Sequence, residues 1–354
     1  MPRAVIIGSG SEIAPTRLTN DQMARVIDTN DEWIRTRSGV EARHFATADI
    51  ATSDLGVAAA GRALEAAGVE KDEVDLVVFA TMTPDHFFPG CGTLLQDKLG
   101  LRPVPCFDIR QQCSGFLYGL QLADAHIRAG MARTVLLVGA EVHIGFMPWT
   151  RQNYAYALGE SDVPPTKEEW EWNSRFRHLV VLFGDAGSAV VLRASEEDDR
   201  GVIDHDLHGA GADFDKLYVP GTGFKHRPYI DAEQLARGDH IPVMDGRYVF
   251  KMATTHMAAV AKTVLERNSV APEQLKMVLM HQANKRINEY CQKTLGLPDE
   301  KVPHNIHKYG NTTAATIPLL WDECVRDGRI TPGDLVLMVA FGAGMTWGAS
   351  LVRA

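Results

Sequence analysis

The sequence lacks the features of a membrane, nucleic-acid-binding or disulfide-stabilised protein. It has no run of Lys or Arg and a formal net charge of −9, so we expect no nucleic-acid-binding surface. No segment approaches the roughly 18 consecutive apolar residues of a membrane-spanning helix. The five cysteines are odd in number and scattered, without the spacing of a disulfide framework or a zinc site. This usage predicts a reducing cytoplasm and no metal.

Strand-like and helix-like segments alternate along the whole chain, which predicts an α/β fold. The 354 residues exceed one average domain, and they contain an internal repeat. Leu64 and Val77 correspond to Leu265 and Val278 at a constant shift of 201 residues, and the helix expected over 113–130 resembles that over 311–328. We therefore predict two duplicated halves, residues 1–195 and 196–354.

Cys113 follows a predicted strand that ends near Ile109 and opens a helix with Phe116 on its apolar face. Unpaired N–H groups and the positive end of the helix dipole at that position favour the thiolate. A cysteine is more commonly a small buried hydrophobic residue. The position of Cys113 at the start of a helix instead favours a role as a nucleophile.

Two polar residues in the second half of the chain, His281 and Asn311, also lie where a predicted strand ends or a predicted helix begins. His281 follows a strand directly, and ligands of α/β proteins meet catalytic groups at the carboxyl ends of strands. Asn311 lies in a glycine turn that opens a helix, where it is either an N-cap or a hydrogen-bond donor of a site. The glycine-rich stretch 341–348 either turns the chain or supplies a backbone N–H to an oxyanion.

Together these motifs resemble the β-ketoacyl-acyl-carrier-protein synthase III family of the thiolase superfamily, and the resemblance runs from the first strand to the last residues. The matching motifs are Asp31-Glu32-Trp33-Ile34, Arg37-Ser38-Gly39, Cys113-Ser114-Gly115-Phe116, Phe183-Gly184-Asp185, His281-Gln282-Ala283-Asn284, Gly310-Asn311-Thr312 and the loop from Gly342 to Gly348. The resemblance implies a thiolase-like fold in which two α/β halves have sheets that sandwich shared helices.

The resemblance also implies roles for individual residues. Cys113 is the acyl-accepting nucleophile, His281 and Asn311 activate a malonyl thioester, and backbone N–H groups of Cys113, Ala343 and Gly344 hold an oxyanion. The residues implied to bind coenzyme A are Trp33, Arg37, Arg177, Arg247 and Asn284. Those implied to contact acyl carrier protein are Lys251, Gln282, Lys285, Arg286 and Lys293. The acyl pocket is assigned to Phe88 and Phe116, and the protein is expected to be a homodimer.

The expected reaction is a decarboxylating Claisen condensation between an acyl group on Cys113 and a malonyl thioester, with acyl-coenzyme A as donor and no cofactor. Loss of carbon dioxide places negative charge on an enolate oxygen, which two fixed donors at His281 and Asn311 can stabilise. The alternatives are a thiolase-fold acyltransferase or a non-decarboxylating condensing enzyme. A non-catalytic scaffold is disfavoured by the intact set of three residues.

The sequence departs from the family most clearly in an extra segment of about two dozen residues near 148–174. Three tryptophans lie in this stretch: Trp149, Trp170 and Trp172. We predict that it forms a flap or an element of the dimer edge that reshapes the entrance for the acyl chain. Ala343 also replaces a glycine that is usual in the family.

Overall fold

The first half of the chain forms a five-stranded sheet. The computed structural model describes residues 2–197 and 200–354, and the strand order in this sheet is β1-β7-β6-β4-β5. The strands are β1 (Arg3–Ile13), β4 (Leu76–Ala80), β5 (Cys106–Ile109), β6 (Thr134–Glu141) and β7 (Ala186–Ser195). β4 and β6 are buried along their whole length, as expected for continuous apolar strands covered on both faces.

The second half forms a four-stranded sheet in the order β11-β12-β13-β8. Its strands are β8 (Gly201–Gly209), β11 (Met277–Met280), β12 (Leu335–Gly342) and β13 (Thr346–Arg353). Both sheets contain neighbouring strands that are parallel, β4 with β6 and β11 with β12. The predicted α/β class is confirmed.

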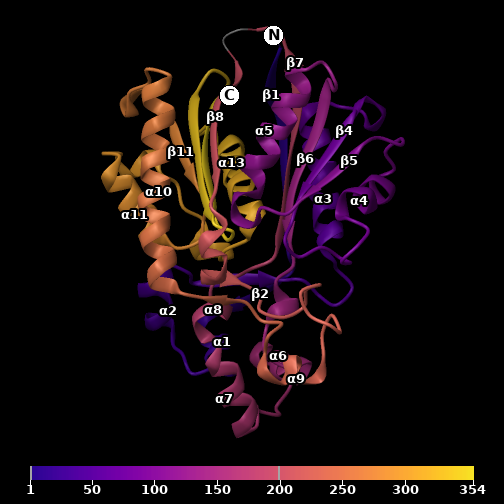
Figure 1. Cartoon of the computed structure of the whole chain (residues 1–354), viewed down its shortest axis with the longest axis vertical. Coiled ribbons are helices and arrows are strands. Elements are labelled where there is room, and N and C mark those ends of the chain that lie inside the picture. The colour runs from indigo at the N-terminus through magenta and orange to yellow at the C-terminus, as the bar shows by residue number, and fades with distance from the viewer. Residues whose placement is uncertain (1, 198–199) are drawn as a thin grey trace.

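Two helices lie between the sheets, and further helices cover the outer face of each sheet (Figure 1). The central pair is α5 (Gly115–Arg128) and α13 (Thr316–Arg326), whose apolar side chains form one core with strands of both sheets. The outer helices are α3 (Thr52–Ala67) and α4 (Cys91–Leu99) on one side, and α10 (Gly246–Arg267) and α11 (Lys285–Thr294) on the other. The shared helices therefore hold the two halves together.

The predicted internal repeat is visible in the backbone itself. β4 and β11 begin 201 residues apart, at Leu76 and Met277, and β6 and β12 do so too. A 3-10 turn precedes each central helix, η2 (Gln112–Ser114) before α5 and η7 (Thr313–Ala315) before α13. The counterpart of Cys113 is consequently Ala314, three residues beyond the Asn311 that the sequence comparison had paired with it.

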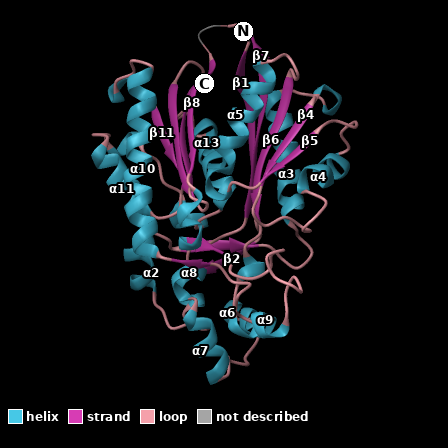
Figure 2. Cartoon of the chain, viewed as in Figure 1, coloured by secondary structure: helices cyan, strands magenta, loops and turns pink. Residues whose placement is uncertain are grey.

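The remaining elements gather at one end of the sheets (Figure 2). They are β2 (Thr16–Thr19), α1 (Asn20–Met23), α2 (Asp31–Ser38), β3 (Ala42–Phe45), α6 (Arg151–Leu158), α7 (Lys167–Arg175), α8 (Arg177–Val180), β9 (Leu217–Tyr218), α9 (Ala232–Arg237), β10 (Val243–Met244) and α12 (Ile306–Tyr309). Short 3-10 turns lie at 71–73, 144–146, 211–216, 272–274 and 299–301.

The extra segment near 148–174 folds into α6 and α7. Asn153 and Asn173 join them inside the protein, because the Asn173 Nδ2 donates to the Asn153 Oδ1 at 2.9 Å. Trp149 and Trp172 pack in the same hydrophobic cluster as Phe45 of β3. The segment is thus an ordered part of this end of the molecule.

Candidate active site

One cavity of about 960 Å³ brings the three predicted catalytic residues together. Cys113, His281 and Asn311 all line it. Cys113 lies in η2 directly before α5, His281 directly follows β11, and Asn311 lies just before η7. The duplicated strand-to-helix connections of the two halves therefore meet at this cavity, as predicted for ligand sites in α/β folds.

Two residues beside the predicted catalytic positions have left-handed backbone conformations. Gln112 has φ of 43° and Thr313 has φ of 48°. This region is unfavourable for residues other than glycine and most unfavourable for a β-branched residue such as threonine. Such strain persists when the surrounding structure holds it, and it is concentrated at functional sites.

The ionisation of Cys113 differs from the sequence-based expectation. Burial, and next the negative charge of Glu141, raise the pKa of the Cys113 thiol to about 12. The predicted thiolate-favouring helix terminus is outweighed, because burial and the Glu141 carboxyl group both disfavour a negative charge on the sulfur. At neutral pH Cys113 is a thiol, so its reaction needs a proton acceptor.

This pKa predicts slow alkylation of Cys113 at neutral pH. The thiolate fraction at pH 7 is about 1 in 100,000 for a pKa of about 12. We expect the rate of carbamidomethylation by iodoacetamide at Cys113 to rise about tenfold per pH unit from pH 7 to 9. Peptide mass spectrometry resolves Cys113 from the four other cysteines. A rate that is already constant at pH 7 would contradict the prediction.

His281 presents one ring nitrogen to the cavity. Its Nδ1 is 2.7 Å from the Thr316 Oγ1, and its buried Nε2 has no hydrogen-bond partner among the described residues. Burial lowers the pKa of His281 to about 3, so the ring is neutral at physiological pH. A neutral imidazole with a free nitrogen can accept or donate one proton there.

The amide of Asn311 is oriented by its own backbone neighbour. Its Oδ1 accepts a hydrogen bond from the Thr313 N–H at 2.8 Å. Since the oxygen is engaged, the Nδ2 group is left as the donor of this side chain. Asn311 therefore has the local bond of a capping residue and also lines the cavity, so the two interpretations of the sequence are compatible.

The glycine-rich loop supplies a backbone donor at the sulfur. The N–H groups of Cys113 and Ala343 hydrogen-bond to the Cys113 thiol, and each lowers its pKa. Gly342 packs against the same residue, so that a Cβ at 342 would lie 3.1 Å from the Cys113 Cβ. Ala343 is not among the non-glycine residues with positive φ in the part of the chain described. An alanine therefore fits this loop without strain.

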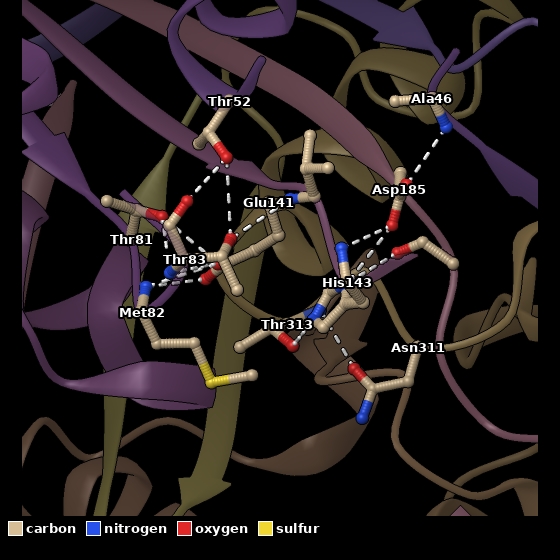
Figure 3. A network of polar contacts seen from close by, with 12 residues as sticks. Ala46, Thr52, Thr81, Met82, Thr83, Glu141, His143, Asp185, Asn311 and Thr313 are labelled. Atoms are coloured by element: carbon tan, nitrogen blue, oxygen red, sulfur yellow. Dashed lines mark hydrogen bonds and ion pairs between the residues drawn. The ribbon is translucent and has the colours of Figure 1, made fainter. Parts of the chain in front are cut away.

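A buried polar network beside the site was missed at the sequence level (Figure 3). Glu141 is fully buried and its carboxyl group accepts bonds from Thr81, Met82 and Thr83. His143 bonds through Nε2 to the Thr313 Oγ1 at 2.8 Å. Both residues stand at or just past the carboxyl end of β6, the same signal that identified His281.

Three residues predicted to bind coenzyme A lie together. The guanidinium carbons of Arg37 and Arg177 are 4.7 and 5.1 Å from the centroid of the Trp33 ring. Asn284 lines the cavity and its Nδ2 donates to the Arg37 carbonyl oxygen at 2.9 Å. Arg247 is exposed in the first turn of α10, next to Gly246 at the cavity. Asn284 thus connects the group around Trp33 with the cavity.

Four of the five residues predicted to meet a carrier protein are exposed on α10 and α11: Lys251, Lys285, Arg286 and Lys293. The prediction for Gln282 is wrong. Its side chain is fully buried, donates to the Met280 carbonyl oxygen at 2.7 Å and accepts from the Asn305 N–H. Gln282 therefore supports the turn after β11 and cannot reach a partner surface.

The predicted acyl-pocket residues do not line the cavity of this chain. Phe116 is 1% exposed and belongs to the core between the sheets, whereas Phe88 is 79% exposed. Phe87, its neighbour, lines the cavity instead, together with Tyr229 at 5.7 Å between ring centroids. No residue of 148–174 lines this cavity, so the expected flap over the entrance is not observed within the described residues.

Within residues 2–197 and 200–354, no group of three His, Cys, Asp or Glu side chains could hold a metal ion. The same ranges contain no helix with the length and apolar character needed to cross a bilayer.

Comparisons with known proteins agree on one family. Family models described as 3-oxoacyl-(acyl-carrier-protein) synthase III and its C-terminal part match residues 107–161 and 265–354. The chain is 41% identical to β-ketoacyl-acyl-carrier-protein synthase III of Paramagnetospirillum magneticum, covering 99% of both chains. It is also 41% identical to the enzyme of Erythrobacter litoralis, covering 100% of both.

Solved structures give the same result. The 3-oxoacyl-acyl-carrier-protein synthase III of Aquifex aeolicus VF5 superposes with a TM-score of 0.84 at 35% identity, covering 99% of this chain and 100% of that one. The enzyme of Pseudomonas aeruginosa PAO1 gives a TM-score of 0.83 at 34% identity, covering 99% and 98%.

Proposed function

Because the chain belongs to the β-ketoacyl-acyl-carrier-protein synthase III family, we propose that Cys113, His281 and Asn311 join an acyl group to a malonyl thioester with loss of carbon dioxide. The chain has the thiolase-like fold of that family and is an acyltransferase of fatty acid biosynthesis. The observation that carries the residue assignment is that all three side chains line one cavity.

In the first half-reaction the Cys113 sulfur attacks the carbonyl carbon of an acyl-coenzyme A. The thiol loses its proton, the acyl–sulfur bond to coenzyme A breaks, and a neutral thioester forms on Cys113. We propose that the N–H groups of Cys113 and Ala343, which hydrogen-bond to the sulfur, also donate to the oxyanion that forms on the acyl group. Gly344 lines the cavity beside them.

In the second half-reaction a malonyl group loses carbon dioxide and becomes an enolate. In this proposal the Asn311 Nδ2 and the His281 Nε2 stabilise its oxygen, and the enolate carbon attacks the Cys113 thioester. Decarboxylation itself provides the carbanion, so the proposed chemistry uses no cofactor or metal. The direct test is incubation with acyl-coenzyme A and malonyl-acyl-carrier-protein, where we expect a 3-oxoacyl product and one carbon dioxide per turnover.

We propose that Trp33, Arg37, Arg177, Arg247 and Asn284 bind coenzyme A. Trp33→Ala should raise the KM for acyl-coenzyme A about tenfold, because an aromatic ring flanked by guanidinium groups can stack on adenine. Carrier protein has no adenine, so the KM for the carrier-bound extender should change less than twofold. Steady-state kinetics in each substrate measures this, and equal losses for both would show that Trp33 only packs.

We propose that Lys251, Lys285, Arg286 and Lys293 contact acyl carrier protein, an acidic partner in this family's reaction. Arg286→Glu should raise the KM for malonyl-acyl-carrier-protein about tenfold at low salt, and less at high salt, because the contact is between exposed charges. Lys167→Glu, an exposed charge on α7, is the matched control and should leave this KM unchanged. Equal effects of the two variants would argue against the patch.

We further propose that the protein is a homodimer in the cytoplasm, with halves bounded at 195 and 196. The dimer is supported by β5 at the end of its sheet with Phe107 exposed. The location is supported by five free cysteines. The boundary is supported by the division between the sheets, since β7 ends at Ser195 and β8 begins at Gly201.

A further inference from the structure

The ring of His281 is held by a single hydroxyl group. Its Nδ1 is 2.7 Å from the Thr316 Oγ1 and its Nε2 is buried without a partner among the described residues. Thr316 is the first residue of α13 and is 1% exposed. No other described residue hydrogen-bonds to either ring nitrogen of His281, so the Thr316 hydroxyl determines which nitrogen carries the proton.

The proton of the Thr316 hydroxyl is already committed. The Thr316 Oγ1 donates to the Thr313 carbonyl oxygen at 3.0 Å. A hydroxyl has one proton to donate and two lone pairs to accept with, and a carbonyl oxygen only accepts. Towards His281, Thr316 is therefore the acceptor, which places the ring proton on Nδ1 and leaves a lone pair on Nε2.

The Thr313 carbonyl is fixed in direction by three constraints. Thr313 is fully buried with φ of 48°, its N–H is bonded to the Asn311 Oδ1, and its Oγ1 is bonded to the His143 Nε2. A strained residue held from several sides keeps one orientation. The carbonyl thus gives the Thr316 proton a permanent acceptor.

We propose that Thr316 is a positioning residue that holds the proton of His281 on Nδ1, so that Nε2 accepts the thiol proton of Cys113 during acylation. The inference rests on the proposed function and extends it by assigning the proton acceptor that the Cys113 thiol requires. Thr316 contacts no reacting atom and acts only through the ring.

The proton transfers balance in both half-reactions. In acylation the Cys113 S–H bond breaks and its proton moves to Nε2, the sulfur bonds to the acyl carbon, and the departing coenzyme A sulfur takes the proton from Nε2. In condensation Nε2 takes one proton from water, a state favoured by the negative malonyl carboxylate, and donates to the enolate oxygen. After the carbon–carbon bond forms, this proton passes to the released Cys113 sulfur. One proton from water is consumed per turnover, as decarboxylation requires.

The test compares Thr316→Val, which keeps the branched shape without the hydroxyl, with Thr316→Ser, which keeps the hydroxyl. Acylation of Cys113 by acyl-coenzyme A is followed in a single turnover by mass spectrometry. We expect Thr316→Val to slow acylation about 10- to 100-fold and Thr316→Ser to remain within about threefold of the unchanged protein. Thermal unfolding of each variant identifies any loss of the fold.

Nitrogen NMR of histidine-labelled protein reads the tautomer directly. Comparison with His281→Ala identifies the His281 signals among the 13 histidines. We expect a proton on Nδ1 in the unchanged protein and in Thr316→Ser, and a mixture of tautomers in folded Thr316→Val. A proton found on Nε2 in the unchanged protein would overturn the inference.

Kinetics of His281→Ala separates this inference from the proposed function. If His281→Ala acylates slowly while folded Thr316→Val acylates normally, the role of Thr316 is refuted and that of His281 stands. If His281→Ala acylates and condenses normally, the proposed role of His281 fails, and the inference about Thr316 fails with it.

Discussion

We expect Cys113→Ala to form no acyl-enzyme and condensation to fall by at least about 1,000-fold, because no other cysteine among the described residues lines the cavity. Intact-protein mass spectrometry after mixing with acyl-coenzyme A measures the first effect, and product formation measures the second.

Cys106→Ala is the matched control. Cys106 is also a half-buried free cysteine, but it lies in β5 and does not line the cavity. This variant should take up one acyl group as the unchanged protein does. An acyl group on the Cys113→Ala variant, at any residue, would show that the nucleophile has been assigned wrongly.

Asn311→Asp separates the two half-reactions. Aspartate keeps the Oδ1 that accepts from the Thr313 N–H, so the local backbone is retained, but it replaces the Nδ2 donor by a second oxygen. Only condensation develops an enolate that needs this donor. We expect condensation to fall about 100- to 1,000-fold while acylation of Cys113 stays within about threefold.

Rates of single-turnover acylation and of carbon dioxide release from malonyl-acyl-carrier-protein give the two effects of Asn311→Asp separately. Loss of both to the same degree would contradict the division of labour between Cys113 and Asn311. Loss of neither would show that Asn311 does not stabilise the enolate.

The sequence predicted the fold, and it pointed to three candidate catalytic residues that line one cavity, because both predictions depend on local patterns. Buried parallel strands are continuous apolar runs, and β4 and β6 are recognisable without any partner. His281 was found because a polar residue directly after such a strand stands out. Glu141 ends β6 in the same way, and the same rule applied there would have identified the network around it.

Other properties depend on three-dimensional packing and were mispredicted or missed. The pKa of Cys113 depends on burial and on a carboxyl group 28 residues further along the chain, at Glu141. Gln282 follows His281 directly but turns inward to bond with Met280 and Asn305. Side-chain direction in a turn cannot be read from a motif, because it is set by the groups that the turn meets.

The paired turns η2 and η7 have a consequence for how the two halves can change. The backbone geometry that holds Cys113 is present twice, yet its second copy carries Ala314, whose Cβ would be 3.5 Å from a Cβ placed at Gly115 of the first. The two copies are therefore under opposite demands. In the proposed mechanism η2 must keep the reactive sulfur of Cys113. In η7 the corresponding residue must be small and unreactive, so that Asn311 and Thr313 beside it can contribute to the site. The duplicated backbone geometry thus carries a candidate nucleophile in one half only, and a cysteine introduced at 314 would not by itself create a second site, because Asn311 and His281 both belong to the second half.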